Sequence, residues 1–244
     1  MAGLLDGRGL PDPMCHHGHM AAPDEMTTMD AIVLMGDPRV TTIPVSDNGD
    51  NLSDLRGLGL RVSSFRADDA GDFAHVRTGL ATRLLQAATV LPRGVQLLII
   101  EGYRPPALQR RYFDEYLHSL RTSIPDSDED QLRMLTSRYV SPPEIAPHSA
   151  GAAIDLTLCG EDGTELGLGT AVNADPEQSA GACYTHHPSV RGEPRRNRAV
   201  LAEALSAAGL VNYPTEWWHW SYGDRYWAMA TGAPSAIYGP IARR

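Results

Sequence analysis

The sequence predicts a single α+β domain with a mainly antiparallel central sheet flanked by helices. Apolar residues recur at helical spacing in residues 73–91, and a second helix is expected at 194–208. Apolar or aromatic runs at 95–100, 152–158 and 210–222 are typical of buried strands. These elements interleave without a regular βαβ repeat and without a glycine-rich phosphate loop, which disfavours a doubly wound parallel sheet.

Composition narrows the class of protein. The 244 residues, 42% of them hydrophobic, are enough to bury a core. The formal net charge of -9 argues against nucleic acid or an anionic membrane as partner, because both require a basic patch. No apolar run approaches the ~20 residues of a membrane span, and no secretory signal is visible, so a cytoplasmic protein is expected. The three scattered cysteines disfavour a disulfide framework.

The first half of the chain contains a leader and then the start of the domain. Residues 1–28 lack periodicity and predict a disordered leader ahead of a domain over 29–244. Within that leader, Cys15-His16-His17-Gly18-His19 is interpreted as a solvated tail with incidental metal affinity. Residues 43–65 predict one or two short strands and loops. The helix over 73–91 should end at Pro92-Arg93-Gly94, before a central strand.

The second half alternates helices and strands. Pro105 and Pro106 stop the central strand, and Pro106 can start the next helix. Residues 160–181 predict a loop, and Gly209 closes the last predicted helix. The expected helices lie at 107–121, 128–138 and 194–208, and the expected strands at 152–158, 210–213 and 216–222.

Residues suited to metal binding gather in two stretches of this half. His148, Asp155 and His219 supply two imidazoles and a carboxylate, the set of a catalytic zinc site that leaves its fourth position to water. Zinc would lower the pKa of that water towards neutrality. Glu216, three residues before His219, is the candidate base that takes its proton. Taken singly, each of these residues also has a structural explanation, as a buried histidine, a turn former or a cap. Taken together, they predict one zinc ion per subunit, held on the sheet.

The spacing of these residues requires irregular backbone. On a regular strand, residues three or seven apart point to opposite faces. Glu216 with His219, and His148 with Asp155, therefore cannot both lie on regular strands. We expect a turn at Gly151 in the first stretch, and Pro214-Thr215 placing Glu216 just ahead of the strand in the second.

A cation is predicted near the same site. Arg104 follows the central strand in the run Gly102-Tyr103-Arg104-Pro105, and Glu101 is close enough in sequence to orient it. Arg104 is a candidate to stabilise the oxyanion that develops when water attacks a peptide carbonyl. Four other histidines are not expected to bind the metal. His186 and His187 are interpreted as solvated loop residues, and His75 and His118 as structural or surface residues on helices.

Together these motifs resemble the D-alanyl-D-alanine dipeptidase family, which includes the vancomycin-resistance dipeptidases. The run Asn212 to Asp224, with Glu216-Trp217-Trp218-His219, is especially similar. The resemblance implies that His148, Asp155 and His219 bind zinc, that Glu216 is general base and acid, and that Arg104 stabilises the transition state. It also implies hydrolysis of a small free dipeptide such as D-Ala-D-Ala in a small, closed pocket.

Two departures from the family pattern, at Ala146 and in the loop over 171–184, concern the substrate more than the chemistry, and Glu101 is a smaller change. Ala146 stands where family members usually have serine, and Glu101 stands where aspartate is more usual. The loop over 171–184 also differs, and it is expected to reshape the pocket.

Two other functions stay open on the sequence. The wider zinc peptidase superfamily includes D,D-carboxypeptidases that act on the cell wall, and the missing secretory signal counts against that function. It also includes the Hedgehog signalling domains, so a non-catalytic, zinc-stabilised binding module is an alternative. The presence of both Glu216 and Arg104 counts against it, because a structural zinc needs neither. Antibiotic resistance, peptidoglycan recycling and processing of another dipeptide stay open as physiological roles.

Overall fold

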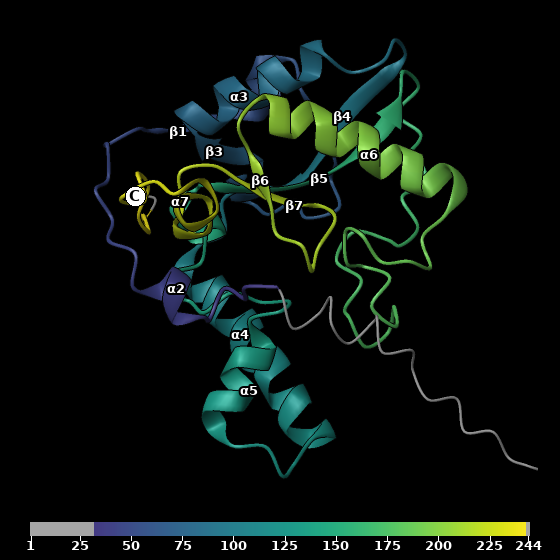
Figure 1. The fold of residues 1–244 in the computed structure, drawn as a ribbon. Coiled ribbons are helices and arrows are strands. Elements are labelled where there is room, and N and C mark those ends of the chain that lie inside the picture. The colour runs from purple at the N-terminus through teal and green to yellow at the C-terminus, as the bar shows by residue number, and fades with distance from the viewer. Residues whose placement is uncertain (1–31, 243–244) are drawn as a thin grey trace, which may run out of the picture. The chain divides into compact units, whose positions relative to one another are not determined.

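The structure is a computed structural model and describes residues 32–242. A five-stranded sheet forms the centre of this part of the chain (Figure 1). Its order is β2-β4-β5-β7-β6. β2 runs parallel to β4, and every other neighbouring pair is antiparallel. The predicted α+β class with a mainly antiparallel sheet is confirmed. The bounds are Arg61–Val62 for β2, Val95–Glu101 for β4, Ala153–Gly160 for β5, His219–Ser221 for β7 and Val211–Asn212 for β6.

β4 and β5 are the buried middle of the sheet. The last five residues of β4 are buried, and so is every residue of β5 from Ala153 to Cys159. Strands covered on both faces read as continuous apolar runs rather than as alternating patterns. This explains why the two strands were predictable at 95–100 and 152–158.

Helices α3 (Thr78–Thr89) and α6 (Gly192–Ala207) pack against each other and lie along the sheet (Figure 1). The expected apolar stripe of α3 is buried at Leu80, Leu84 and Ala87. The expected start of this helix at residue 73 is wrong. Residues 72–74 form a 3-10 turn, and β3 (His75–Arg77) pairs antiparallel with β1 (Leu52–Asp54).

The reason for that difference is a backbone partner distant in sequence. The amide groups of Gly102 and Tyr103 donate to the carbonyls of Phe73 and His75, each at 2.6 Å. These bonds, together with the pairing of β3 to β1, keep residues 73–77 out of an α-helix although their apolar spacing suits one.

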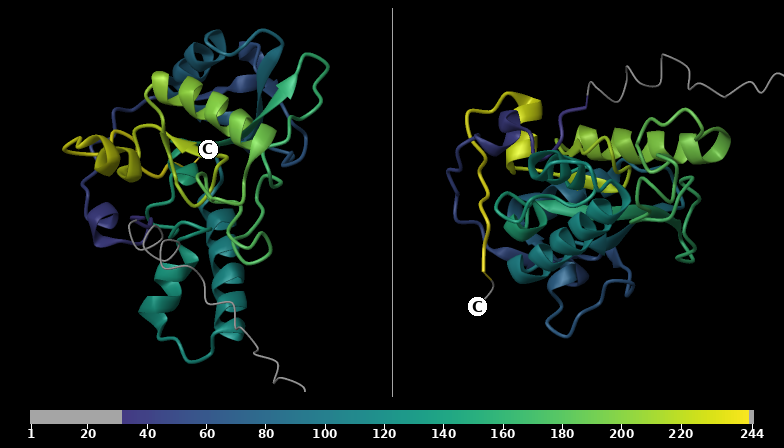
Figure 2. Two further views of the ribbon diagram at one scale, coloured as in Figure 1. Left: turned by 45° about the vertical axis from the view of Figure 1, so that its right-hand side comes forward. Right: turned by 90° about the horizontal axis from the view of Figure 1, so that it is seen from below.

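A second group of helices extends away from the sheet (Figures 1 and 2). α4 (Pro106–Ser123) and α5 (Glu129–Thr136) pack on each other, and Asp128 caps α5 by accepting from the Gln131 amide at 2.8 Å. They enclose their own apolar cluster of Phe113, Leu117, Leu120, Leu132 and Val140. The predicted helices at 107–121 and 128–138 are confirmed within two residues at each end.

Two short helices were not predicted. α2 (Pro38–Thr41) and α7 (Arg225–Thr231) pack on each other, and aspartates cap both N-termini. The 3-10 helix Leu55–Leu58 follows β1 within the region expected to hold short strands and loops. No helix within residues 32–242 is long and apolar enough to cross a membrane. The leader predicted at 1–28, with its Cys15–His19 cluster, lies outside the described residues.

Candidate functional site

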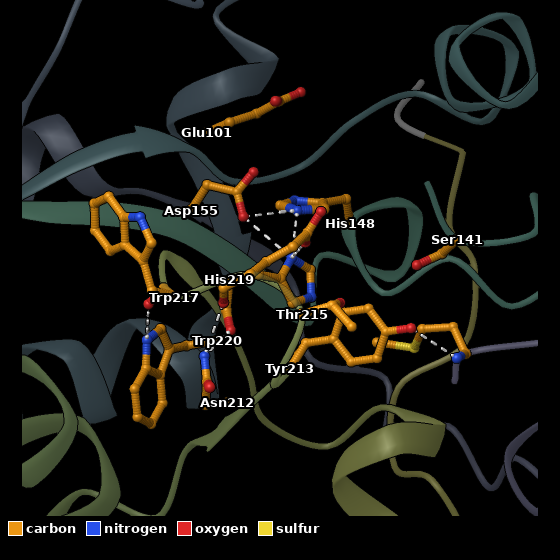
Figure 3. A network of polar contacts seen from close by, with 12 residues as sticks. Glu101, Ser141, His148, Asp155, Asn212, Tyr213, Thr215, Trp217, His219 and Trp220 are labelled. Atoms are coloured by element: carbon orange, nitrogen blue, oxygen red, sulfur yellow. Dashed lines mark hydrogen bonds and ion pairs between the residues drawn. The ribbon is translucent and has the colours of Figure 1, made fainter. Parts of the chain in front are cut away.

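Three adjacent strands place Glu101, Asp155 and His219 in a row across the sheet. Glu101 of β4 pairs with Asp155 of β5, and Asp155 pairs with His219 of β7. Residues directly opposite on antiparallel strands project to the same face, with β-carbons about 4.5–5.5 Å apart. The sheet therefore brings two of the three predicted metal ligands together (Figure 3).

His148 reaches the same point from a 3-10 turn, His148–Ala150, that precedes β5. Gly151 ends this turn in the left-handed conformation, with φ of 64°, which favours glycine. The turn expected at Gly151 is thus present. The Gly102 carbonyl lies 2.6 Å from Nδ1 of His148. Because a carbonyl only accepts, Nδ1 is the donor in this contact, and Nε2 faces Asp155 and His219.

The three candidate ligand atoms form a nearly equilateral triangle (Figure 3). Asp155 Oδ1 lies 3.1 Å from His219 Nδ1 and 3.3 Å from His148 Nε2, and the two nitrogens lie 3.2 Å apart. Zinc bonds of 2.0–2.2 Å in tetrahedral geometry require ligand atoms about 3.3 Å apart. All three side chains are buried. The donor set and its spacing therefore fit zinc.

The protonation of these groups suits metal binding. Burial favours the neutral acid at Asp155, but the charge and hydrogen bond of His148, with those of His219, hold its pKa well below the usual value. Burial lowers the pKa of His219 and so favours the neutral imidazole. Metals bind the carboxylate form of aspartate and the neutral form of histidine, so the direction of each pKa shift favours metal binding.

Glu216 lies in a turn just ahead of β7, as its spacing predicted. Its amide donates to the Tyr213 carbonyl at 2.9 Å, and its carbonyl accepts from the His219 amide at 3.2 Å. The Asn212 side chain donates to the carbonyls of both Glu216 and His219 at 3.0 Å. This turn puts Glu216 Oε2 3.7 Å from His219 Nδ1. Burial, and then the charge of Asp155, raise the pKa of Glu216 well above its ordinary value, against the opposing charge of Arg104.

Arg104 is buried and held by two side chains. Its Nε and Nη2 donate to the Glu101 carboxylate at 2.7 and 2.8 Å, and Nη1 donates to Gln109 Oε1 at 2.8 Å. Nη2 also lies 4.0 Å from Asp155 Oδ2. Burial alone would lower the pKa of Arg104, but Glu101 and Asp155 raise it, so the side chain stays charged. The expected contact between Glu101 and Arg104 is present, whereas Gln109 was not predicted.

A cavity of about 320 Å³ opens beside these groups. This volume is at the small end for ligand sites in proteins. Asn173, from the loop over 171–184, borders it, as expected for a loop that shapes the pocket. The other lining residues outside the predicted set include Arg66, Tyr112, Tyr116, Tyr139 and Ser141.

Comparison with known proteins places this arrangement in a family. The family described as D-ala-D-ala dipeptidase matches residues 74–232, more than half of the chain and the whole of the predicted site. The chain belongs to the D-Ala-D-Ala dipeptidase family. It is 27% identical over 218 residues to the D-alanyl-D-alanine dipeptidase of Synechocystis sp., covering 76% of this chain and 87% of that protein.

Two further similarities have narrower coverage or lower identity. The D-alanyl-D-alanine dipeptidase of Escherichia coli K12 is 32% identical over 127 residues, which is 52% of this chain and about half (54%) of that protein. Among solved structures, the LdcB LD-carboxypeptidase matches with a TM-score of 0.42 and 16% identity, over 77% of this chain and 75% of the other.

All five residues predicted for the site in this family member, namely His148, Asp155, His219, Glu216 and Arg104, line the one cavity. Their roles stay predictions. The other histidines within residues 32–242 lie elsewhere: His186 and His118 are exposed, and His187 Nδ1 contacts Ser189 Oγ at 2.7 Å. His75, expected on a helix, is instead buried in β3, with Nδ1 2.6 Å from the Gly71 carbonyl.

Proposed function

We propose that this chain is a zinc dipeptidase that hydrolyses a free dipeptide, with D-Ala-D-Ala the first substrate to test. The observation that carries the proposal is the triangle of buried donor atoms, 3.1–3.3 Å on each side, with a carboxylate next to it. His148, Asp155 and His219 would hold the ion. Zinc bound there would polarise the substrate carbonyl and lower the pKa of a water molecule.

Glu216 is the proposed proton carrier. Its carboxylate lies beside the proposed metal ligands, with Oε2 3.7 Å from His219 Nδ1. Glu216 takes a proton from the attacking water. It then gives this proton to the leaving amine as the carbon–nitrogen bond breaks, which releases the second amino acid.

Arg104 is proposed to stabilise the negative charge that develops on the carbonyl oxygen. A guanidinium has five N–H groups, and Glu101 and Gln109 accept from three different nitrogens of this one. N–H groups on Nη1 and Nη2 stay available to the cavity that Arg104 lines. Since the contacts to Glu101 and Gln109 already hold the group, it needs no reorganisation during the reaction, and such donors typically contribute several kcal/mol.

The size of the substrate is proposed from the cavity and the relatives. The two sequence relatives carry the name D-alanyl-D-alanine dipeptidase. A cavity of about 320 Å³, bordered by the loop over 171–184, suits a small peptide. A cytoplasmic location stays a prediction from the sequence.

The test is a panel of peptides given to the zinc-loaded protein. It contains D-Ala-D-Ala, L-Ala-L-Ala, the two mixed dipeptides and a longer peptide ending in D-Ala-D-Ala. Selective cleavage of D-Ala-D-Ala is expected. Cleavage of the longer peptide would instead favour a D,D-carboxypeptidase. Stoichiometric zinc with no cleavage of any peptide would favour a non-catalytic zinc module.

A further inference from the structure

A second arginine lies at the wall of the cavity beside Arg104. Arg66 Nε is 3.8 Å from Glu101 Oε2, the same oxygen that accepts from Arg104 Nη2 at 2.8 Å. The Tyr112 ring also lies near both guanidinium groups, with its centroid 5.9 Å from Arg66 and 5.0 Å from Arg104. Two positive charges therefore lie side by side and share one carboxylate.

That carboxylate is committed to Arg104. Both Glu101 oxygens accept from Arg104 within 2.8 Å, which leaves Arg66 the longer contact. With its amide oxygen turned towards Arg66, Asn173 accepts from Nη2 at 2.9 Å and from Nε at 3.3 Å. An amide satisfies hydrogen bonds without neutralising charge. Within residues 32–242, Arg66 Nη1 has no hydrogen-bond partner.

Arg66 is thus a positive charge at a ligand cavity without an anion of its own. Its side chain is 30% exposed, so it is partly withdrawn from water, which would otherwise screen the repulsion from Arg104. An anion bound beside it would lower that repulsion. A guanidinium binds carboxylates in particular, because its planar fork matches both oxygens.

A free dipeptide carries such an anion at a suitable place. Its carboxylate lies one residue beyond the cleaved bond, and consecutive α-carbons are about 3.8 Å apart. Arg104, which is proposed to face the cleaved carbonyl, shares Glu101 and Tyr112 with Arg66. We propose that Arg66 binds the C-terminal carboxylate of the substrate and makes the enzyme select peptides in which that carboxylate is free. This inference rests on the proposed function.

The test compares an acid with its amide. We expect the Arg66→Gln variant to raise KM for D-Ala-D-Ala by about 10- to 100-fold, the effect of a lost charged hydrogen bond, with kcat nearly unchanged. KM for D-Ala-D-Ala amide should not change, so the preference for the acid disappears. Arg66→Lys should restore part of that preference. Arg110→Gln, at an exposed position of α4 outside the cavity, is the matched control and should behave as wild type.

A merely structural role would give a different pattern. If Arg66 only tethers Asn173 and its loop, Arg66→Gln should affect the acid and the amide equally, and that result would overturn the proposal. An unchanged KM for the acid would overturn it too.

Binding provides a readout that needs no turnover. Calorimetry in a Glu216→Gln background should show the acid binding more tightly than the amide only when Arg66 is present. If wild type cleaves no peptide of the panel, the proposed function fails, whereas this measurement still decides on Arg66. Equal binding of acid and amide, or binding of neither, overturns the inference.

Discussion

Replacing Glu101 by glutamine tests how Arg104 is held. Glu101 is 3% exposed, and its two oxygens accept from Nε and Nη2 of Arg104. Glutamine has nearly the same size, but it offers one oxygen and turns an NH2 group towards a partner that can only donate. Removing one partner of a buried ion pair costs roughly 3–5 kcal/mol, and since the glutamine oxygen keeps one hydrogen bond, we expect about 3 kcal/mol. In a domain of this size that lowers Tm by about 6–12 °C.

The loss should depend on pH. Burial favours the neutral acid at Glu101, but the charge and hydrogen bonds of Arg104 outweigh it and hold the pKa below the usual 4.5. A carboxylate whose pKa is lower in the folded state stabilises the fold fully above its unfolded pKa. That stabilisation is lost as the pH falls through the folded pKa. The Tm difference between wild type and Glu101→Gln should therefore be full at neutral pH and should narrow below pH 4.5.

The assay is thermal unfolding of both proteins at neutral and acid pH, with initial rates on the preferred dipeptide. Glu129→Gln is the matched control, because Glu129 pairs with Arg121 on the surface, where both side chains are at least half exposed. Exposed pairs contribute little, so Tm of this control should stay within about 2 °C of wild type. We expect Glu101→Gln to lower kcat by about 10- to 100-fold, since Arg104 is no longer held in place. An unchanged Tm, or a Tm difference that does not vary with pH, would refute the reasoning.

Three further variants test the rest of the site. Glu216→Gln should retain zinc in metal analysis and lower kcat by about 100- to 10,000-fold, and normal turnover would exclude Glu216 from proton transfer. His219→Ala should lose both zinc and thermal stability, because metal binding is coupled to folding; full metal content by mass spectrometry would remove His219 from the ligand set. Gly102→Ala should lower Tm and weaken zinc retention against a chelator. The new β-carbon would lie 2.4 Å from the His75 carbonyl oxygen and would displace Gly102, whose own carbonyl contacts His148 Nδ1. Wild-type values would show that this close approach does not position His148.

That the candidate residues lie together could be predicted in part from their residue types and in part from the resemblance of their spacing to the dipeptidase family. Since the side-chain period of a strand is two, the spacing also required a turn at Gly151 and an irregular approach to Glu216. The structure has both, in the left-handed Gly151 and in the Tyr213–Glu216 hydrogen bond.

What the sequence could not provide depends on contacts between distant segments. Val76 and Leu80 fit a helical stripe, but backbone bonds from Gly102 and Tyr103 keep the first part of that segment extended. Helix α2 spans only Pro38–Thr41, which is too short for a periodic signal. Gln109 and Arg66 show nothing in sequence that links them to Glu101 and Arg104, and only the folded chain brings these groups together.

A buried arginine holds the segment 168–185, which includes the loop over 171–184, and links the wall of the cavity to the segment that carries Glu216. Arg198 of α6 is 5% exposed, and its guanidinium donates to loop carbonyls at Leu168, Ala182, Tyr184 and Thr185. The same guanidinium faces the Trp217 ring at 5.5 Å, and the Trp217 amide donates to the Cys183 carbonyl at 3.0 Å. Trp217 follows Glu216 directly, while Asn173 of the same loop borders the cavity. Because one loop both borders the cavity and contacts the neighbour of Glu216, a change in this loop is expected to alter the pocket and the position of Glu216 together.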